Sequence, residues 1–160
     1  MNTFIIFLAQ YLIYLIGIFV LLYFFLRLPR GELKSAILLY VIGILVAIIL
    51  VKIAGSIYYN PRPFVDGNFT PLIPHSSNNG FPSNHTVAAF LVASLLWRYS
   101  RRFAGILFIA ACTVGVARVL ANVHHIEDII GGIVIAILAT LSANIAVHFA
   151  VNSKVFKTDN

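Results

Sequence analysis

The sequence predicts an all-α fold, a polytopic membrane bundle of about five transmembrane helices. The 160 residues are 61% hydrophobic and only 10% charged, and the mean hydropathy is +0.97. A water-soluble domain of this size does not need that balance, so lipid must be the main solvent. The apolar runs are long enough to serve as spans, because about 20 apolar residues cross a hydrocarbon core about 30 Å thick. We expect residues 1–160 to form a single membrane-embedded domain.

The first two expected spans occupy residues 4–26 and 35–58. The first contains no charged residue and is followed by a short charged loop. A cleaved signal peptide fits it poorly, because no positive charge precedes it and the apolar stretch is longer than a typical signal core. The second contains one charge, Lys52, near its far end. Both segments therefore predict helices that cross the membrane.

The stretch 59–83 is rich in Pro, Gly, Asn and Ser, which predicts a re-entrant or extracytoplasmic loop between the second and third spans. The remaining spans are expected at 84–97, 103–117 and 126–151. The span at 84–97 is only about 21 Å long at 1.5 Å per residue, well short of the hydrocarbon thickness. Its polar start should therefore lie below the membrane surface, and irregular backbone at that depth must line a polar cavity or be covered by protein.

The basic residues divide unevenly between the two faces that five spans create. Eight of the eleven fall on one face, namely Arg27, Arg30, Lys34, Arg98, Arg101, Arg102, Lys154 and Lys157. The positive-inside rule makes that face cytoplasmic. We therefore expect a multi-pass protein of the cell (inner) membrane with its C-terminus in the cytoplasm and its N-terminus on the extracytoplasmic side. Because these charges lie in short clusters between apolar runs, the net charge of +6 indicates topology rather than nucleic-acid binding.

Three polar segments distant in sequence fall on the other, extracytoplasmic face: residues 60–63, 82–85 and 118–128. Ionisable residues close to the apolar region are costly, so a functional role is the default interpretation. Arg62 and Arg118 lie beside histidines in these segments. Because a guanidinium pairs bidentately with phosphate oxygens, the pattern predicts a site for an anion.

The start of the span at 84–97 carries Ser83 and His85. The Ser83 hydroxyl could simply cap the helix, which is the purely structural explanation. The same helix start also offers free backbone N–H groups and the positive end of a helix dipole, and both favour phosphate. His85 would lie on the first turn and point into that site.

His124 and Asp128 are four residues apart, so on one helical turn they share a face and can form a hydrogen bond. A carboxylate on one imidazole nitrogen fixes the tautomer and leaves the lone pair of the other nitrogen free to attack. A zinc site is the alternative, since His and Asp at this spacing also bind zinc. Two nearby arginines would repel a dication, so we expect neither a metal nor another cofactor.

Together, Arg62-Pro63, Pro82-Ser83-Asn84-His85 and the pattern Arg118, His124, Asp128 resemble the three-part signature of the type 2 phosphatidic acid phosphatase superfamily of membrane lipid phosphatases. The resemblance implies that His124 attacks phosphorus to form a phosphohistidine while Asp128 orients it. It further implies that His85 protonates the leaving group and then activates water. The phosphoryl oxygens would be held by Arg62, Arg118, Ser83 and the backbone at Asn84.

Three positions depart from that signature. The family's lysine stands seven residues before the arginine, where this chain has Gly55; Lys52 lies one turn further away and would have to reach the phosphate by snorkelling. Asn84 replaces the usual glycine, and Asn tolerates a positive φ better than most residues. Ala117 replaces a serine, which removes one hydroxyl donor.

The stretch from Arg62 to Ser83 also resembles the small undecaprenyl diphosphatases of the same superfamily. That resemblance implies undecaprenyl diphosphate as the substrate. His75 could contact a second phosphate, and the alternative for a loop histidine is that it is merely solvated. Phosphatidylglycerophosphate, phosphatidate and lipid A phosphates stay open as substrates, as does the alternative of a non-catalytic lipid-phosphate transporter or binding protein. The expected partners are a lipid phosphate and the bilayer, and no pattern indicates an oligomeric state.

Overall fold

The computed structural model describes residues 2–152, and all regular secondary structure in this part of the chain is helical, without a strand. The helices are α1 (Asn2–Gln10), α2 (Leu12–Leu26), α3 (Leu33–Ile57), α4 (Pro63–Asp66), α5 (Asn84–Leu96), α6 (Arg101–Leu120) and α7 (Ile126–Asn152). A short 3-10 turn, η1 (Arg30–Glu32), joins α2 to α3. The predicted all-α class is confirmed.

Three of the described helices are long and apolar enough to cross a membrane: α3 together with η1, then α6 and α7. The pair α1 and α2 also qualifies when it is counted as one broken span. Helix α5 is apolar but has only 13 residues. The predicted bundle of apolar, membrane-crossing helices is therefore confirmed.

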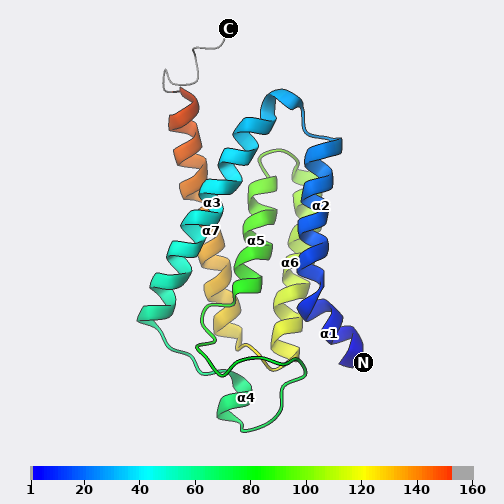
Figure 1. The fold of residues 1–160 in the computed structure, drawn as a ribbon, viewed down its shortest axis with the longest axis vertical. Helices are drawn as coiled ribbons and strands as arrows, with labels where there is room; N and C mark the ends of the chain where they lie inside the picture. The colour runs from blue at the N-terminus through cyan, green and yellow to red at the C-terminus, as the bar shows by residue number, and fades with distance from the viewer. Residues whose placement is uncertain (1, 153–160) are drawn as a thin grey trace.

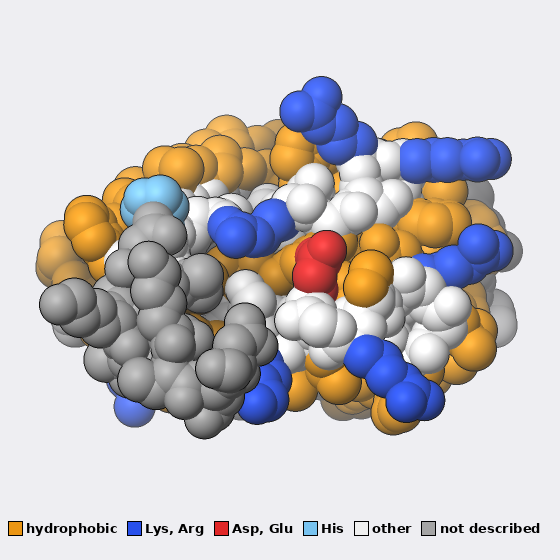
Figure 2. All heavy atoms as spheres, turned by 90° about the horizontal axis from the view of Figure 1, so that it is seen from above, with side chains coloured by type: hydrophobic (Ala, Val, Ile, Leu, Met, Phe, Trp, Pro, Cys, Tyr) orange, Lys and Arg blue, Asp and Glu red, His pale blue; other side chains and the backbone are white. Residues whose placement is uncertain are grey.

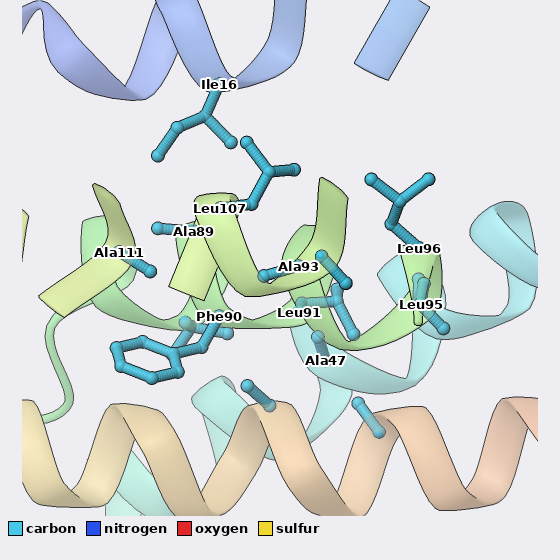
Figure 3. Close-up of a cluster of buried hydrophobic side chains, with 14 of the residues drawn as sticks. Ile16, Ala47, Ala89, Phe90, Leu91, Ala93, Leu95, Leu96, Leu107 and Ala111 are labelled. Carbon is cyan, nitrogen blue, oxygen red and sulfur yellow. The ribbon is translucent and has the colours of Figure 1, made fainter. Parts of the chain in front are cut away.

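Helix α5 lies at the centre of the bundle and packs against α2, α3, α6 and α7 (Figures 1 and 3). A helix surrounded in this way needs apolar side chains on every face. The buried residues of α5 occur all round it, among them Ala89, Leu91, Ala93 and Leu95. Alanines at these contacts let the neighbouring helices approach closely. This packing fixes the start of α5, and the polar residues there, relative to the other helices.

The first span is broken at Tyr11, whereas the sequence predicts one continuous helix over 4–26. Helices α1 and α2 meet there at an angle of 44°. Neither proline nor glycine stands at the break. Instead, the carbonyl of Ala9 accepts a hydrogen bond from Nη1 of Arg118 at 3.4 Å. A side chain that bonds to a carbonyl of the helical ladder is a recognised cause of a kink.

The connection between α6 and α7 also differs from the prediction of a span over 103–117. Helix α6 continues to Leu120, so Arg118 lies on its last turn. Asn122 follows in the left-handed region with φ of 58°, which asparagine adopts more readily than most residues. This tight reversal returns the chain to the bundle directly after Arg118.

The two ends of the molecule are built from different connections (Figure 1). At one end lie the α2–α3 and α5–α6 connections, and Figure 2 shows Lys and Arg side chains around this end. The exposed basic residues of those connections are Arg27, Arg30, Lys34, Arg98, Arg101 and Arg102. Lys154 and Lys157 lie outside the described residues. The opposite end carries the long segment 58–83 and the α6–α7 turn.

Candidate active site

A pocket of about 200 Å³ lies where segment 58–83 meets the start of α5 and the α6–α7 turn. Its polar lining consists of Arg62, His75, Asn78, Asn79, Asn84, His85, Arg118 and His124. The three polar segments that are distant in sequence thus contribute to one pocket. The apolar remainder of the lining is Val51, Phe81 and Pro82.

His124 and Asp128 form a buried pair, with side chains 3% and 0% exposed. The Nδ1 atom of His124 lies 3.1 Å from Oδ2 of Asp128. The sequence predicts both on one helical turn, but His124 lies in the turn before α7, and only Asp128 belongs to the helix. The contact still forms because the Asp128 carboxylate also accepts a bond of 2.9 Å from the backbone N–H of His125, which folds the turn back over the helix start.

The other ring nitrogen of His124 lies between two arginines. Its Nε2 atom is 3.4 Å from Nη1 of Arg62 and 3.4 Å from Nη2 of Arg118. A guanidinium can only donate hydrogen bonds, so Nε2 must carry the lone pair and Nδ1 the proton that is donated to Asp128. Burial lowers the pKa of His124 below its usual value, although the bond to Asp128 opposes that shift. The imidazole is therefore neutral at pH 7 and has the tautomer of a nucleophile.

Arg62 is held in place through every nitrogen of its guanidinium. Nη1 donates to the carbonyl of Val123 at 2.7 Å. Nε and Nη2 donate to Oδ1 of Asn78 at 3.2 and 3.1 Å, and Nη2 also reaches the carbonyl of Asn79 at 3.4 Å. The side chain is only 5% exposed. A cation fixed in this way can stabilise charge on a transferring phosphoryl group without first reorganising.

Arg118 supplies the second buried cation, at 2% exposure. Its two terminal nitrogens contact Ala9 and His124, while its Nε is buried without a hydrogen-bond partner among the described residues. Two guanidinium charges and one carboxylate, that of Asp128, leave the site with a net positive charge. Buried charge of one sign requires a counter-charge, so the site is built for an anion.

Asn79, which the sequence analysis did not single out, joins segment 58–83 to the end of α3. Its Oδ1 accepts from the backbone N–H groups of Asn60 and Phe81 at 3.0 and 2.9 Å. Its Nδ2 donates to the carbonyls of Gly55 and Tyr58, both at 2.9 Å. In the sequence it belongs to a run of Ser and Asn that indicates only a loop. The geometry shows that this loop is ordered by its own amide side chains.

Asn60 and Gly80 complete the surroundings of the Asp128 carboxylate. Asn60 donates from Nδ2 to Oδ1 of Asp128 at 2.8 Å, and Gly80 donates from its N–H to the carbonyl of Asn60 at 2.8 Å. A Cβ atom at position 80 would lie 3.0 Å from that carbonyl and 3.1 Å from Oδ2 of Asp128. Glycine therefore allows the loop to pass directly over the carboxylate that orients His124.

Ser83 and Asn84 behave differently from their sequence expectations. The Ser83 hydroxyl makes no cap of the helix start; it is fully buried and accepts a bond from the Thr86 hydroxyl at 3.1 Å. The pocket lining includes Asn84 but not Ser83. Asn84 begins α5 and is not among the residues with positive φ, so the tolerance of asparagine for that region is not needed here.

Lys52 lies beside the pocket rather than in its lining. It is exposed and lines an apolar groove of about 670 Å³ between α3 and α5, which shares Val51 and Asn84 with the pocket. Its assignment as a phosphate ligand stays a prediction.

His75 and His85 both line the pocket. The ring of His75 lies 6.2 Å from the ring of His124, nearly perpendicular to it. Burial, followed by the charges of Arg62 and Arg118, lowers the pKa of His75 to about 4, so it is neutral at pH 7. Its buried Nδ1 has no hydrogen bond of ordinary geometry within the described chain. No three His, Cys, Asp or Glu side chains among residues 2–152 are grouped to hold a metal ion.

Known proteins resemble this chain in sequence and in fold. Residues 36–152 match the family described as the PAP2 superfamily. The chain is 31% identical over 142 residues to the Bacillus licheniformis protein named bacitracin transport permease protein BcrC, covering 88% of this chain and 69% of that protein. It is 33% identical over 82 residues to the undecaprenyl-diphosphatase BcrC of Bacillus subtilis strain 168, covering 51% of this chain and 42% of that protein.

A third relative is the putative undecaprenyl-diphosphatase YbjG of Escherichia coli K12, 29% identical over 92 residues, with 57% of this chain and 46% of that protein covered. Among solved structures, Aquifex aeolicus LpxE superposes with a TM-score of 0.71 at 26% identity, covering 89% of this chain and 84% of that one. A phosphatidylglycerolphosphate phosphatase of PAP2 type from Bacillus subtilis superposes with a TM-score of 0.56 at 23% identity, covering 97% and 79%, and shows the fold alone.

Proposed function

Because the chain belongs to the PAP2 superfamily and is a multi-pass membrane lipid phosphatase, we propose that it hydrolyses a lipid-linked diphosphate, undecaprenyl diphosphate in particular, through a phosphohistidine on His124. One observation carries the mechanism. The Nε2 lone pair of His124 lies between two guanidinium groups while Asp128 holds the opposite nitrogen. A nucleophile, its orienting carboxylate and the cations for the phosphoryl oxygens thus occupy one pocket.

The proposed reaction has two displacements at phosphorus. In the first, the terminal phosphoryl group lies between Arg62 and Arg118, Nε2 of His124 attacks, and the bond to the leaving oxygen breaks. His85, which takes up a proton when the anionic substrate is bound beside it, gives that proton to the leaving oxygen. In the second, His85 takes a proton from water, which attacks phosphorus, breaks the P–N bond and releases inorganic phosphate. Asp128 accepts the Nδ1–H bond throughout and stabilises the positive charge that develops on the ring.

The relatives support undecaprenyl diphosphate as the substrate. Two of the three named above are called undecaprenyl-diphosphatases, one of them putative, at 33% and 29% identity. The chain spans less than half of the length of each of these two proteins. From these relatives we therefore infer only the chemistry of the substrate headgroup, which is a phosphate ester or anhydride attached to a lipid.

We place the site on the extracytoplasmic face, because six exposed basic residues lie at the opposite end of the bundle and only Lys52 among the described residues is a basic side chain exposed near the site. Single cysteines at Ser76 and Ser100 test this placement in a chain whose exposed Cys112 has been replaced by alanine. In intact cells, an impermeant thiol reagent should label position 76 and leave position 100 unlabelled. The reverse pattern would contradict the orientation.

The experiment for the activity compares wild type, His124→Ala and the control His148→Ala. His148 is exposed near the far end of α7, away from the pocket. Each purified full chain is incubated in detergent with undecaprenyl diphosphate, with and without EDTA, and inorganic phosphate is measured. Wild type and His148→Ala should release phosphate in both conditions, and His124→Ala should not.

Transport is the second candidate, because one relative is named a transport permease. Binding for transport needs an anion pocket but no nucleophile with an orienting carboxylate. Equal phosphate release by His124→Ala and wild type would reject the proposed mechanism. Loss of the wild-type activity in EDTA would show that the expectation of no metal is wrong.

A further inference from the structure

A second polar cavity adjoins the catalytic pocket. It has a volume of about 340 Å³ and shares His75, His85 and Arg118 with that pocket. Its other wall consists of Gln10, Tyr11 and Tyr14, at the break between α1 and α2, with Ile73 and Pro74 from segment 58–83. The cavity exists where it does because the first span bends.

We propose that this second cavity receives the phosphate that remains on the lipid, and that Gln10 and Tyr11 make the enzyme prefer diphosphates over monophosphates. The inference rests on the proposed function, since it assigns the inner phosphate of the same substrate.

The position of His85 between the two cavities is the first argument. In phosphoryl transfer the nucleophile and the leaving oxygen lie on opposite sides of phosphorus. His124 lines the catalytic pocket but not the second cavity, whereas His85 lines both. If His85 protonates the leaving oxygen, the group attached to that oxygen extends from His85 into the second cavity. In a diphosphate that group is the inner phosphate.

The unused polar atoms are the second argument. Arg118 lines both cavities and is 2% exposed, and its buried Nε has no partner among the described residues. The buried Nδ1 of His75, on the same shared wall, also lacks a hydrogen bond of ordinary geometry in the described chain. Buried polar groups without partners are rare because they are costly. A bound phosphate would supply an acceptor to the Nε–H of Arg118, and to Nδ1 of His75 in the tautomer that carries its proton there.

The break in the first span is the third argument. The bond from Arg118 to the Ala9 carbonyl connects the end of α1 directly to the catalytic cation. It brings the amide of Gln10 and the phenol of Tyr11 to the cavity wall, and both groups can donate to phosphate oxygens. Helices α1 and α2 precede residues 36–152, the part that matches the family.

The groove beside Lys52 is the rival location. It shares Asn84 with the catalytic pocket, and its lining is apolar apart from Lys52 and Asn84. Lys52 is exposed there, whereas the second cavity has a buried arginine on its wall. Buried donors in the second cavity favour it over the groove as the place for a second phosphate.

The experiment measures kcat/KM of the purified full chain for farnesyl diphosphate and farnesyl monophosphate, which share one hydrocarbon chain. The variants are Gln10→Leu, Tyr11→Phe, their combination, and Lys52→Met for the rival. The matched control is Tyr59→Phe, since Tyr59 is exposed and lines neither cavity. The combined variant should lose at least about tenfold in kcat/KM for the diphosphate and stay within about twofold for the monophosphate, as expected when hydrogen bonds to a charged group are removed.

An unchanged monophosphate rate would also show that the variants are folded. As a second readout, pyrophosphate should inhibit wild type more strongly than inorganic phosphate does, and the combined variant should lose that difference. Equal losses for both substrates, no loss for either, or a selective loss confined to Lys52→Met would each overturn the inference. A wild-type protein that releases phosphate from neither substrate would instead reject the proposed function, and the inference with it.

Discussion

The two ends of the bundle use arginine in opposite ways. At the site end, Arg62 and Arg118 are 5% and 2% exposed and surround His124. At the other end, Arg98 and Arg101 are exposed; Arg98 donates to Oδ1 of Asn144 at 3.3 Å, and Arg101 lies 6.0 Å from the centre of the Trp97 ring. The first pair is desolvated and fixed, and the second is solvated and loosely held.

The two kinds of arginine have different roles: the buried pair serves catalysis, and the exposed pair serves the orientation of the protein in the membrane. An exposed arginine beside a span contributes to orientation through its charge, and its individual contacts are worth little. A buried arginine must be compensated. Among residues 2–152, Asp128 is the only carboxylate of this network, and it already accepts bonds from Asn60 and His125 and pairs with His124. A bound phosphate would supply the negative charge that the two arginines still need. Four tests, three based on substitutions and one on a titration, measure how far the two ends differ.

The largest effect is expected at Asp128. In Asp128→Asn an amide can donate to Nδ1, which would place the proton on Nε2 and remove the lone pair from the attacking atom. We expect kcat for lipid diphosphate hydrolysis to fall by about 10³-fold or more, as for other triads with the wrong tautomer. Glu127→Gln is the matched control, because Glu127 is exposed on the same turn and should change kcat less than twofold. A loss below tenfold for Asp128→Asn would show that tautomer control is not required.

Exchanging arginine for lysine at each end sharpens the comparison directly. Lysine keeps the charge but cannot reproduce the planar fork that bonds Val123, Asn78 and Asn79. We expect Arg62→Lys to lower kcat/KM by about 10²-fold, consistent with loss of one fixed donor to the transition state. Arg101→Lys should leave kcat/KM within about twofold. Similar losses at both positions would remove the distinction between the two ends.

The ionisation of His124 provides a pH test. Its folded-state pKa is lowered by burial, so the ring should stay neutral as the pH falls past the usual histidine value of about 6.5 and take up a proton only below it. Nitrogen-15 NMR of histidine-labelled protein in detergent can follow this titration, with His124→Asn to assign the signal. Because the unfolded chain binds this proton first, stability should also fall as pH drops below about 6.5. A His124 midpoint at or above that value would contradict the inferred environment.

The smallest effect is expected at Gly80. A methyl group there would lie 3.0 Å from the Asn60 carbonyl and 3.1 Å from Oδ2 of Asp128, so the loop must move by a few tenths of an ångström. We expect Gly80→Ala to reduce kcat about three- to tenfold, since small displacements of an orienting group are costly in catalysis. Gly105→Ala is the control on α6, because the added Cβ would meet nothing within 4 Å apart from its chain neighbours and its own helix backbone. An unaffected Gly80→Ala enzyme would mean that the loop over Asp128 is not part of the positioning.

The features predicted from the sequence are those that depend on local composition and on spacing. The long apolar runs predicted a membrane protein made of helices, because the thickness of the bilayer fixes how many apolar residues a helix needs to cross it. The four-residue separation of His124 and Asp128 gave their contact, although the helix begins only after His124. The joining of Arg62 and Arg118 in one pocket followed from the alternation of spans between two faces.

The features missed depend on long-range contacts that leave no periodic signal. The bend at Tyr11 coincides with a bond between residues 109 positions apart, Arg118 and Ala9, which no local pattern encodes. Asn79 looks like any loop asparagine until its four hydrogen bonds are traced. Ser83 has the sequence of a helix cap, but its hydroxyl bonds to Thr86 instead.

Trapping the covalent intermediate tests the central claim most directly. Purified enzyme would be mixed for milliseconds with a lipid diphosphate labelled with phosphorus-32 in its terminal phosphate, quenched in alkali and digested for peptide mapping. The account predicts label that is stable in base, labile in acid and located on His124, and absent from His124→Ala. Label on another residue, or wild-type turnover with His124 never phosphorylated, would contradict it.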